Sequence, residues 1–151
     1  MTSKHSHMQD HGRALISQLL GKLLPSLVTA GTTDTSLFGS FVDGQLLAGT
    51  GAQIDLVNPA TGGVFLSYLD AGEAVVVQAA QAAETGQKHW WAKTAAERGR
   101  LMYACGQAIR DVADDLAWLE SLSAGKPIRD CRVEVAKVAE MFEYYAGWCD
   151  K

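Results

Sequence analysis

Thr94-Ala95-Ala96-Glu97 begins the stretch Thr94–Pro127, TAAERGRLMYACGQAIRDVADDLAWLESLSAGKP, which decides the fold of this chain. A threonine followed three residues later by a glutamate forms a capping box, in which each side chain binds a backbone N–H at the start of a helix. Gly125 can adopt the left-handed conformation that ends a helix, and Pro127 cannot continue one. Between these ends, apolar residues recur at the 3.6-residue period of a helix with one buried face: Leu101, Cys105, Ala108, Ile109, Val112, Leu116 and Leu119. The stretch therefore predicts one amphipathic helix.

Two further amphipathic helices flank this one. Asp70–Ala83 begins with a residue suited to an N-cap, and we expect Gly86 to end that helix. The segment His89–Trp91 then reads as a connecting loop that carries two large aromatic residues. The last predicted helix begins at about Asp130 and stops at Gly147. Its apolar face is formed by Val135, Val138, Ala139, Phe142 and Tyr145.

Short strands precede the helices. Residues 41–47 predict a hairpin around Asp43-Gly44, because this dipeptide is a strong signal for a two-residue turn. Residues 53–57 and 64–68 predict two more strands, joined by a turn at residues 58–63 whose Asn, Pro, Thr and Gly suit that role. The predicted fold class is an α+β fragment, with a small antiparallel hairpin piece followed by three amphipathic helices.

Residues 1–40 form an extension in this interpretation, and residues 41–151 form the folded part. Arg13–Leu24 predicts a short amphipathic helix that ends at Pro25 and lies on the surface or docks on a partner. Residues 28–40 are rich in Thr, Ser and Gly and are typical of a linker. Three histidines occur among the first twelve residues, but termini are usually poorly ordered, so we predict no metal site there: His5, His7 and His11.

Composition excludes two classes of function. With 151 residues and a net charge of -4, the chain lacks the basic surface that nucleic acid binding requires. No run of about 18 apolar residues occurs, so we predict no membrane span. Three cysteines without zinc-site spacing are typical of a reduced cytoplasmic protein.

No catalytic motif stands out in the chain. It contains no complete Gly-x-Gly-x-x-Gly, no phosphate-binding loop that opens a helix, and no nucleophile elbow. Cys105 lies on the apolar helix face and is expected in the core. Cys131 lies near a helix N-terminus beside Arg129 and Arg132, whose charges would lower its pKa, so it is the one candidate reactive thiol.

Several short segments, in order along the chain, resemble the aldehyde dehydrogenase family. Phe41-Val42-Asp43-Gly44 is similar to the family's F-I-N-G, and residues 57–62 to its V-x-N-P-A-T-G. Residues 76–83 resemble A-V-x-A-A-x-A-A, and Trp91 with residues 97–101 resembles the W…R-x-x-x-L passage. Residues 119–127 resemble L-E-T-L-D-N-G-K-P, and residues 144–151 are similar to Y-Y-A-G-W-A-D-K almost letter for letter.

The resemblance implies that residues 41–151 are the N-terminal part of an α/β, Rossmann-like NAD(P)-binding domain. The family's nucleophilic cysteine, its general-base glutamate and its cofactor-binding sheet have no counterpart here, so no catalytic or cofactor-binding residue is assigned. The resemblance places Val133, Glu134 and Lys137 at the aldehyde entrance. It also matches Val57 and Ser123 to a monovalent-cation site in some members, but Ser123 replaces the aspartate ligand, and we assign no metal site.

Two functions follow as hypotheses. In the first, the chain is the N-terminal part of an NAD- or NADP-dependent aldehyde dehydrogenase, inactive and without cofactor by itself. Its partner is then the remainder of that enzyme or a second copy of itself. In the second, it is a non-catalytic docking module or one subunit of a split enzyme. Both hypotheses would explain the apolar helix faces, which need another surface to cover them.

Overall fold

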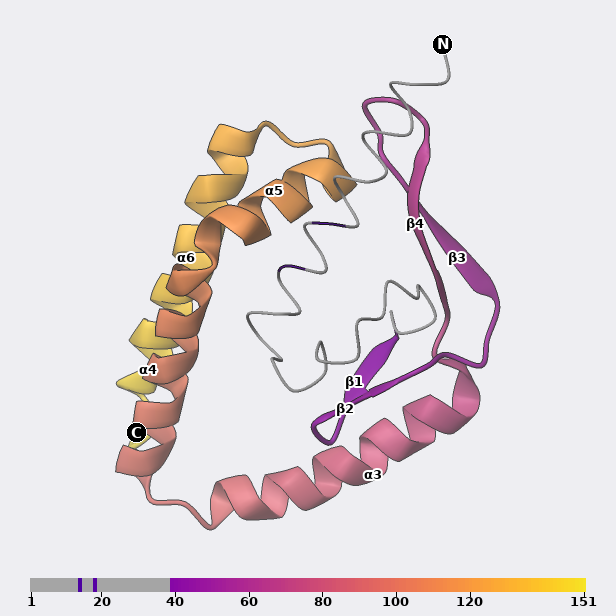
Figure 1. Ribbon diagram of the computed structural model, residues 1–151. Coiled ribbons are helices and arrows are strands. Elements are labelled where there is room, and N and C mark those ends of the chain that lie inside the picture. Colours follow the sequence, from indigo (N-terminus) through magenta and orange to yellow (C-terminus); the bar gives the residue numbers. More distant parts are fainter. Residues whose placement is uncertain (1–13, 15–17, 19–38) are drawn as a thin grey trace. The chain divides into compact units, whose positions relative to one another are not determined.

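The computed structural model describes Ala14, Gln18 and residues 39–151. The predicted helix at 13–24 and the histidines near the start therefore lie outside the described residues, apart from Ala14 and Gln18. The chain divides into two compact units, residues 1–86 and 87–151, with the boundary inside one helix. Figure 1 shows the described elements, and each unit is treated by itself below.

The first unit contains two antiparallel strand pairs. β1 (Ser40–Val42) pairs with β2 (Gln45–Leu47), and β3 (Gln53–Val57) pairs with β4 (Val64–Leu69). Both residues of the Asp43-Gly44 turn have positive φ, 49° and 77°, as a type I′ hairpin turn requires. The predicted hairpin and both predicted strands are confirmed.

A polar turn joins β3 to β4. The Asn58 side chain accepts a hydrogen bond from the N–H of Ala60 at 2.9 Å, and its backbone N–H donates to Gly63 O at 2.9 Å. Asn58 is buried, and these hydrogen bonds satisfy its polar groups. The buried apolar residues described in this unit are Val42, Phe65, Leu66 and Val75.

The pairing continues past the ends of β3 and β4 in a second set of backbone bonds. Gly51 N donates to Asp70 O at 2.9 Å, Asp70 N to Ala52 O at 2.8 Å, and Thr50 N to Ala71 O at 3.2 Å. This extension takes up the backbone of Asp70, so the following helix begins at Gly72 and not at Asp70 as predicted.

Helix α3 (Gly72–Trp91) is longer than predicted. It passes through Gly86 and includes His89–Trp91, so the predicted helix end at Gly86 and the predicted loop at His89–Trp91 were wrong. A glycine inside a helix costs only about 1 kcal/mol relative to alanine, which is too little to end a helix that other residues favour.

Among the described helices, none combines the length and the apolar character that a membrane span needs.

The first testable prediction concerns Gly86. A Cβ atom there would meet no atom within 4 Å, so Gly86→Ala should raise the free energy of unfolding by about 0.5–1 kcal/mol through backbone entropy alone. Urea denaturation followed by circular dichroism measures this. A loss of stability would show that Gly86 has a conformational or packing role.

The second unit is helical. α4 (Ala95–Asp111) and α5 (Ala113–Ala124) both pack against α6 (Ile128–Ala146), and Figure 1 shows α6 running beside α4 while α5 turns away. Its buried residues are Gly106, Val112, Ala117, Cys131 and Ala139. The fold class is thus the predicted α+β fragment, with the central predicted helix divided in two.

The division occurs at Val112. Its φ and ψ of -121° and 19° are not helical, and its N–H bonds back to the carbonyl oxygens of Ile109 and Arg110. Asp114 and Asp115 then occupy the first turn of α5, where negative charge favours a helix N-terminus. The break buries Val112 and lets α5 pack on the start of α6, which one straight helix would not allow.

Both ends of the Thr94–Pro127 stretch are confirmed. Thr94 Oγ1 accepts from Glu97 N at 3.3 Å, and the Glu97 carboxylate accepts from Thr94 N at 2.8 Å. The hydrogen bonds from the side chain and backbone of Thr94 lower the pKa of Glu97. At the other end, Gly125 has φ 72° and its N–H donates to Ser121 O, as a left-handed helix stop requires.

Candidate functional site

The predicted entrance residues all lie on α6 but do not share one face. Val133 is 62% exposed, and Lys137 lies one turn further along the same face, where it pairs with Glu140. Glu134 instead reaches toward the loop between α5 and α6. The structure therefore brings Val133 and Lys137 together and places Glu134 in a different cluster.

That cluster is centred on Lys126. Its Nζ lies 2.7 Å from Glu134 Oε2 and 3.0 Å from Glu120 Oε1, so one ammonium group joins α5 to α6. The hydrogen bonds to Glu134 and Glu120 raise the pKa of Lys126 above its ordinary value. Ser121 Oγ donates to Lys126 O at 2.7 Å and holds the same loop from the α5 side.

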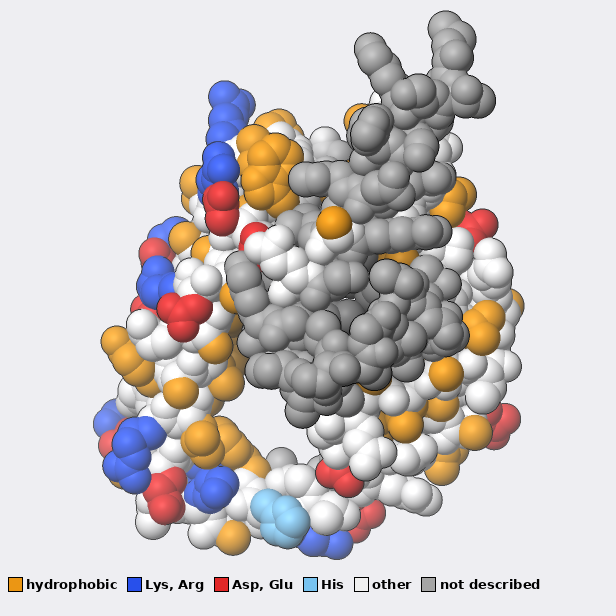
Figure 2. Space-filling model, in the orientation of Figure 1, with side chains coloured by type: hydrophobic (Ala, Val, Ile, Leu, Met, Phe, Trp, Pro, Cys, Tyr) orange, Lys and Arg blue, Asp and Glu red, His pale blue; other side chains and the backbone are white. Residues whose placement is uncertain are grey.

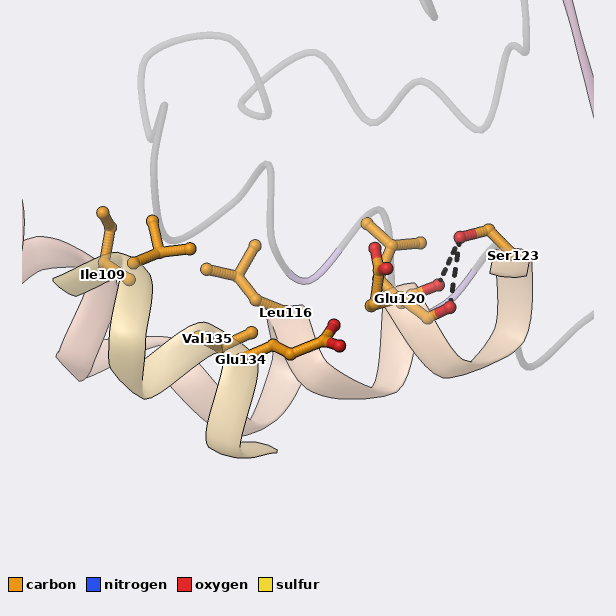
Figure 3. A pocket seen from close by; sticks show the side chains of 8 residues that line it. Ile109, Leu116, Glu120, Ser123, Glu134 and Val135 are labelled. Atoms are coloured by element: carbon orange, nitrogen blue, oxygen red, sulfur yellow. Dashed lines mark hydrogen bonds between the residues drawn. The ribbon is translucent and has the colours of Figure 1, made fainter. Parts of the chain in front are cut away.

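An apolar groove opens beside this cluster. It has a volume of about 490 Å³ and is lined by Ile109, Leu116, Leu119, Val135 and Val138, with Glu120, Ser123 and Glu134 at its polar edge. Figure 3 shows Ile109 and Leu116 projecting to the same side of their helices. We call this feature the α5–α6 groove. Most of its lining suits apolar groups.

The serine that replaces the family's aspartate faces its own helix. Ser123 Oγ donates to Leu119 O at 2.9 Å, which occupies its proton within α5 (Figure 3). Val57 lies in the first unit and Ser123 in the second. Within residues 39–151, no group of three or more His, Cys, Asp or Glu side chains is arranged to hold a metal ion.

The prediction for Cys131 was wrong. Its side chain is fully buried, and burial raises the pKa of the thiol, with Glu120 and Glu134 raising it further. The two arginines next to it in sequence are paired elsewhere: Arg129 Nε lies 3.1 Å from Asp130, and Arg132 Nε lies 2.7 Å from Asp114. A helix N-terminus therefore does not activate this thiol.

The prediction for Cys105 was also wrong, because this residue is exposed. The face of α4 that contacts α6 is not its apolar stripe but the neighbouring face that contains Gly99 and Gly106. Cys105 shares the outer face with Leu101, which is 43% exposed. The sequence located the apolar stripe correctly but not the surface that α6 covers.

The second testable prediction follows from the two thiols. In native protein at pH 8, a disulfide reagent such as 5,5′-dithiobis(2-nitrobenzoate) should modify Cys105 at least about tenfold faster than Cys131, since only an exposed thiolate reacts readily. Single Cys→Ser variants assign each phase, and denaturant should abolish the difference. Equal rates in native protein would contradict the burial of Cys131.

Sequence reasoning missed the bridge made by Lys126 and the α5–α6 groove. Both depend on where α5 and α6 meet, and that follows from the break at Val112. The aspartate pair at the start of α5 was the available signal for this break, because acidic residues are enriched in first helical turns.

Large apolar side chains remain exposed across the second unit. Figure 2 shows hydrophobic surface among the charged side chains of the molecule. On α6 these exposed residues are Val133, Val138, Met141, Phe142, Tyr144 and Tyr145, and Trp148 follows the helix. Extended apolar surface of this kind usually marks an interface.

Known protein families and solved structures include matches to this chain. Residues 47–151 match the aldehyde dehydrogenase family. An NAD-dependent benzaldehyde dehydrogenase from Corynebacterium glutamicum has the same fold over 78% of this chain and 26% of its own, with TM-score 0.72 and 20% identity.

Two further solved structures are closer in sequence. PnpE in complex with nicotinamide adenine dinucleotide is 36% identical, with TM-score 0.69, over 74% of this chain and 23% of its own. Betaine aldehyde dehydrogenase from Staphylococcus aureus in complex with NAD+ is 25% identical, with TM-score 0.68, over 73% and 22%. The chain thus spans about a quarter of the length of the solved structures it matches.

Proposed function

The chain belongs to the aldehyde dehydrogenase family, and from this premise we propose that it works as the N-terminal part of an NAD(P)-dependent aldehyde dehydrogenase. The intact enzyme would oxidise an aldehyde to a carboxylic acid with a cysteine nucleophile and a nicotinamide cofactor. This chain would contribute structure and part of the substrate entrance, while the nucleophile, base and cofactor site come from the remaining sequence.

One observation carries the proposal. The apolar stripe of α4 faces outward, and the outer face of α6 bears further exposed apolar residues, so neither helix is covered as its sequence pattern demands. The chain spans about a quarter of the length of its matched structures, and the remaining sequence of such an enzyme would cover these faces. The Rossmann-like sheet implied by the family resemblance would supply such a cover.

The entrance is part of the same proposal. Val133 and Lys137 form one exposed patch on α6, and Glu134 would border it from the side of α6 that pairs with Lys126. We take NAD as the first cofactor to test, since PnpE and the betaine aldehyde dehydrogenase were both solved with it; NADP is the alternative. A cytoplasmic location and assembly into a homo-oligomer complete the proposal, and cell fractionation and sedimentation test them.

The decisive experiment measures aldehyde-dependent NADH formation. We expect none from the purified chain with benzaldehyde or betaine aldehyde, and activity only when the remaining three quarters of an aldehyde dehydrogenase is supplied. Turnover by the purified chain alone would overturn the proposal. Sequencing the coding region downstream of Lys151 separates a continuous enzyme from a split one or from a free-standing docking module.

A further inference from the structure

We propose that the α5–α6 groove seats an apolar polypeptide segment from the remainder of the aldehyde dehydrogenase, and that this segment carries a lysine or arginine beside its apolar side chains. The inference rests on the proposed function and names the contact through which the two parts join. It concerns the groove, which is distinct from the Val133 and Lys137 patch at the proposed entrance.

The shape of the apolar surface favours a polypeptide over a small ligand. Val135, Val138, Phe142 and Tyr145 follow one another along α6 at spacings of three and four residues, so they lie on one side of the helix. The first two line the groove, and the last two are exposed beyond it. Ten residues of helix span about 15 Å, so the stripe continues the groove into a track that an extended or helical segment can follow.

The charge at the polar edge of the groove indicates which charge an occupant should carry there. Glu120 and Glu134 share the single ammonium group of Lys126, which leaves the edge with one net negative charge. Ser123 has its proton committed to Leu119 O and offers no donor to a partner. An occupant with a basic residue at this edge would complete the charge balance, whereas an acidic residue would meet repulsion.

The same charge argues against a second copy of this chain as the occupant. A two-fold interface sets the same patch against itself, so two polar edges with the same net negative charge would be buried in one interface. The remainder of the enzyme has no such constraint, and it is the larger missing partner, since the chain covers 23% of the PnpE chain.

The test co-expresses the full 151-residue chain, carrying an affinity tag, with the part of PnpE that this chain does not match, and measures copurification and the dissociation constant. We expect Val138→Asp to weaken binding at least about tenfold, because it places a charge in the apolar groove. Val76→Asp is the matched control, because it makes the same exchange at an exposed valine of α3 that does not line the groove, and it should stay within about twofold. Circular dichroism checks that both variants keep their helices.

A second variant tests the charge. Glu120→Gln should weaken binding and reduce its dependence on salt, because it removes the net negative charge at the edge. Failure of the wild-type chain to bind would contradict the proposed function itself. Wild-type affinity in Val138→Asp would show that the segment does not bind in the α5–α6 groove, and it would leave the proposed function unaffected.

Two other occupants would also overturn the inference. Wild-type self-association in sedimentation that Val138→Asp abolishes would identify a second copy in the groove. Binding that strengthens at least about tenfold over wild type after deletion of residues 1–38 would identify the chain's own leucine-rich segment as the occupant. In either result the remainder of the enzyme is not the natural occupant.

Discussion

Replacing Gly49 with alanine should lower the free energy of unfolding by about 2–4 kcal/mol, because it disrupts three backbone hydrogen bonds that each contribute about 0.5–1.5 kcal/mol. A Cβ atom at this position would lie 2.2 Å from the carbonyl oxygens of both Leu69 and Asp70. Neither oxygen can move alone, since Asp70 O accepts from Gly51 N and Asp70 N donates to Ala52 O. The whole segment that leads into α3 would have to shift.

Urea denaturation gives the size of this effect, and hydrogen exchange at the Asp70 amide gives its place. Gly44→Asn is the control within the same unit, because nothing lies within 4 Å of a Cβ at Gly44 and asparagine tolerates its positive φ. It should change stability by less than about 1 kcal/mol. If Gly49→Ala unfolds at the wild-type urea concentration, the close approach of residues 49–51 to β4 is wrong.

The second large effect is expected at Gly106, where α4 and α6 come closest. A Cβ atom there would lie 2.9 Å from Glu143 Cγ and 3.1 Å from Ala139 O, so Gly106→Val should cost about 2–3 kcal/mol through overpacking. Displacing Glu143 would also disturb its two bonds from Arg110, each 2.7 Å, and its bond from Gln107 at 2.8 Å.

The matched control is Gly86→Val, which makes the same exchange in an uncrowded part of a helix. It should change the free energy of unfolding by under about 0.5 kcal/mol, since valine and glycine differ little in helix propensity. Thermal unfolding of both variants gives the comparison. Equal midpoints would mean that α4 and α6 do not pack through this glycine face.

Much of the local structure could be predicted from neighbouring residues. The capping box at Thr94, the type I′ turn at Asp43-Gly44 and the helix stop at Gly125 each depend on hydrogen bonds or backbone freedom within four residues. The family could also be recognised from the sequence, because the resemblance rests on the order of short motifs. The family match over residues 47–151 confirms it.

The two errors have different causes. Gly86 does not end α3, because the helix penalty of one glycine is only about 1 kcal/mol and the neighbouring turns of the helix outweigh it. Cys131 is not an activated thiol, because burial against other helices outweighs the charges near it in sequence. A local sequence signal, such as a glycine in a helix, changes the stability of a conformation by only about 1 kcal/mol, and interactions with the rest of the structure can outweigh it.

By itself the sequence determined the element types, the sharp turns and stops, and the family of this protein, since each is set by contacts over a few residues or by motif order. Only the tertiary structure decided the break at Val112, the glycine face on which α4 meets α6, the exposure of Cys105 and the bridge from Lys126 to two carboxylates. These features depend on which surfaces meet across long stretches of chain. An amphipathic pattern shows that a helix has a face to bury, but it does not name the surface that buries it.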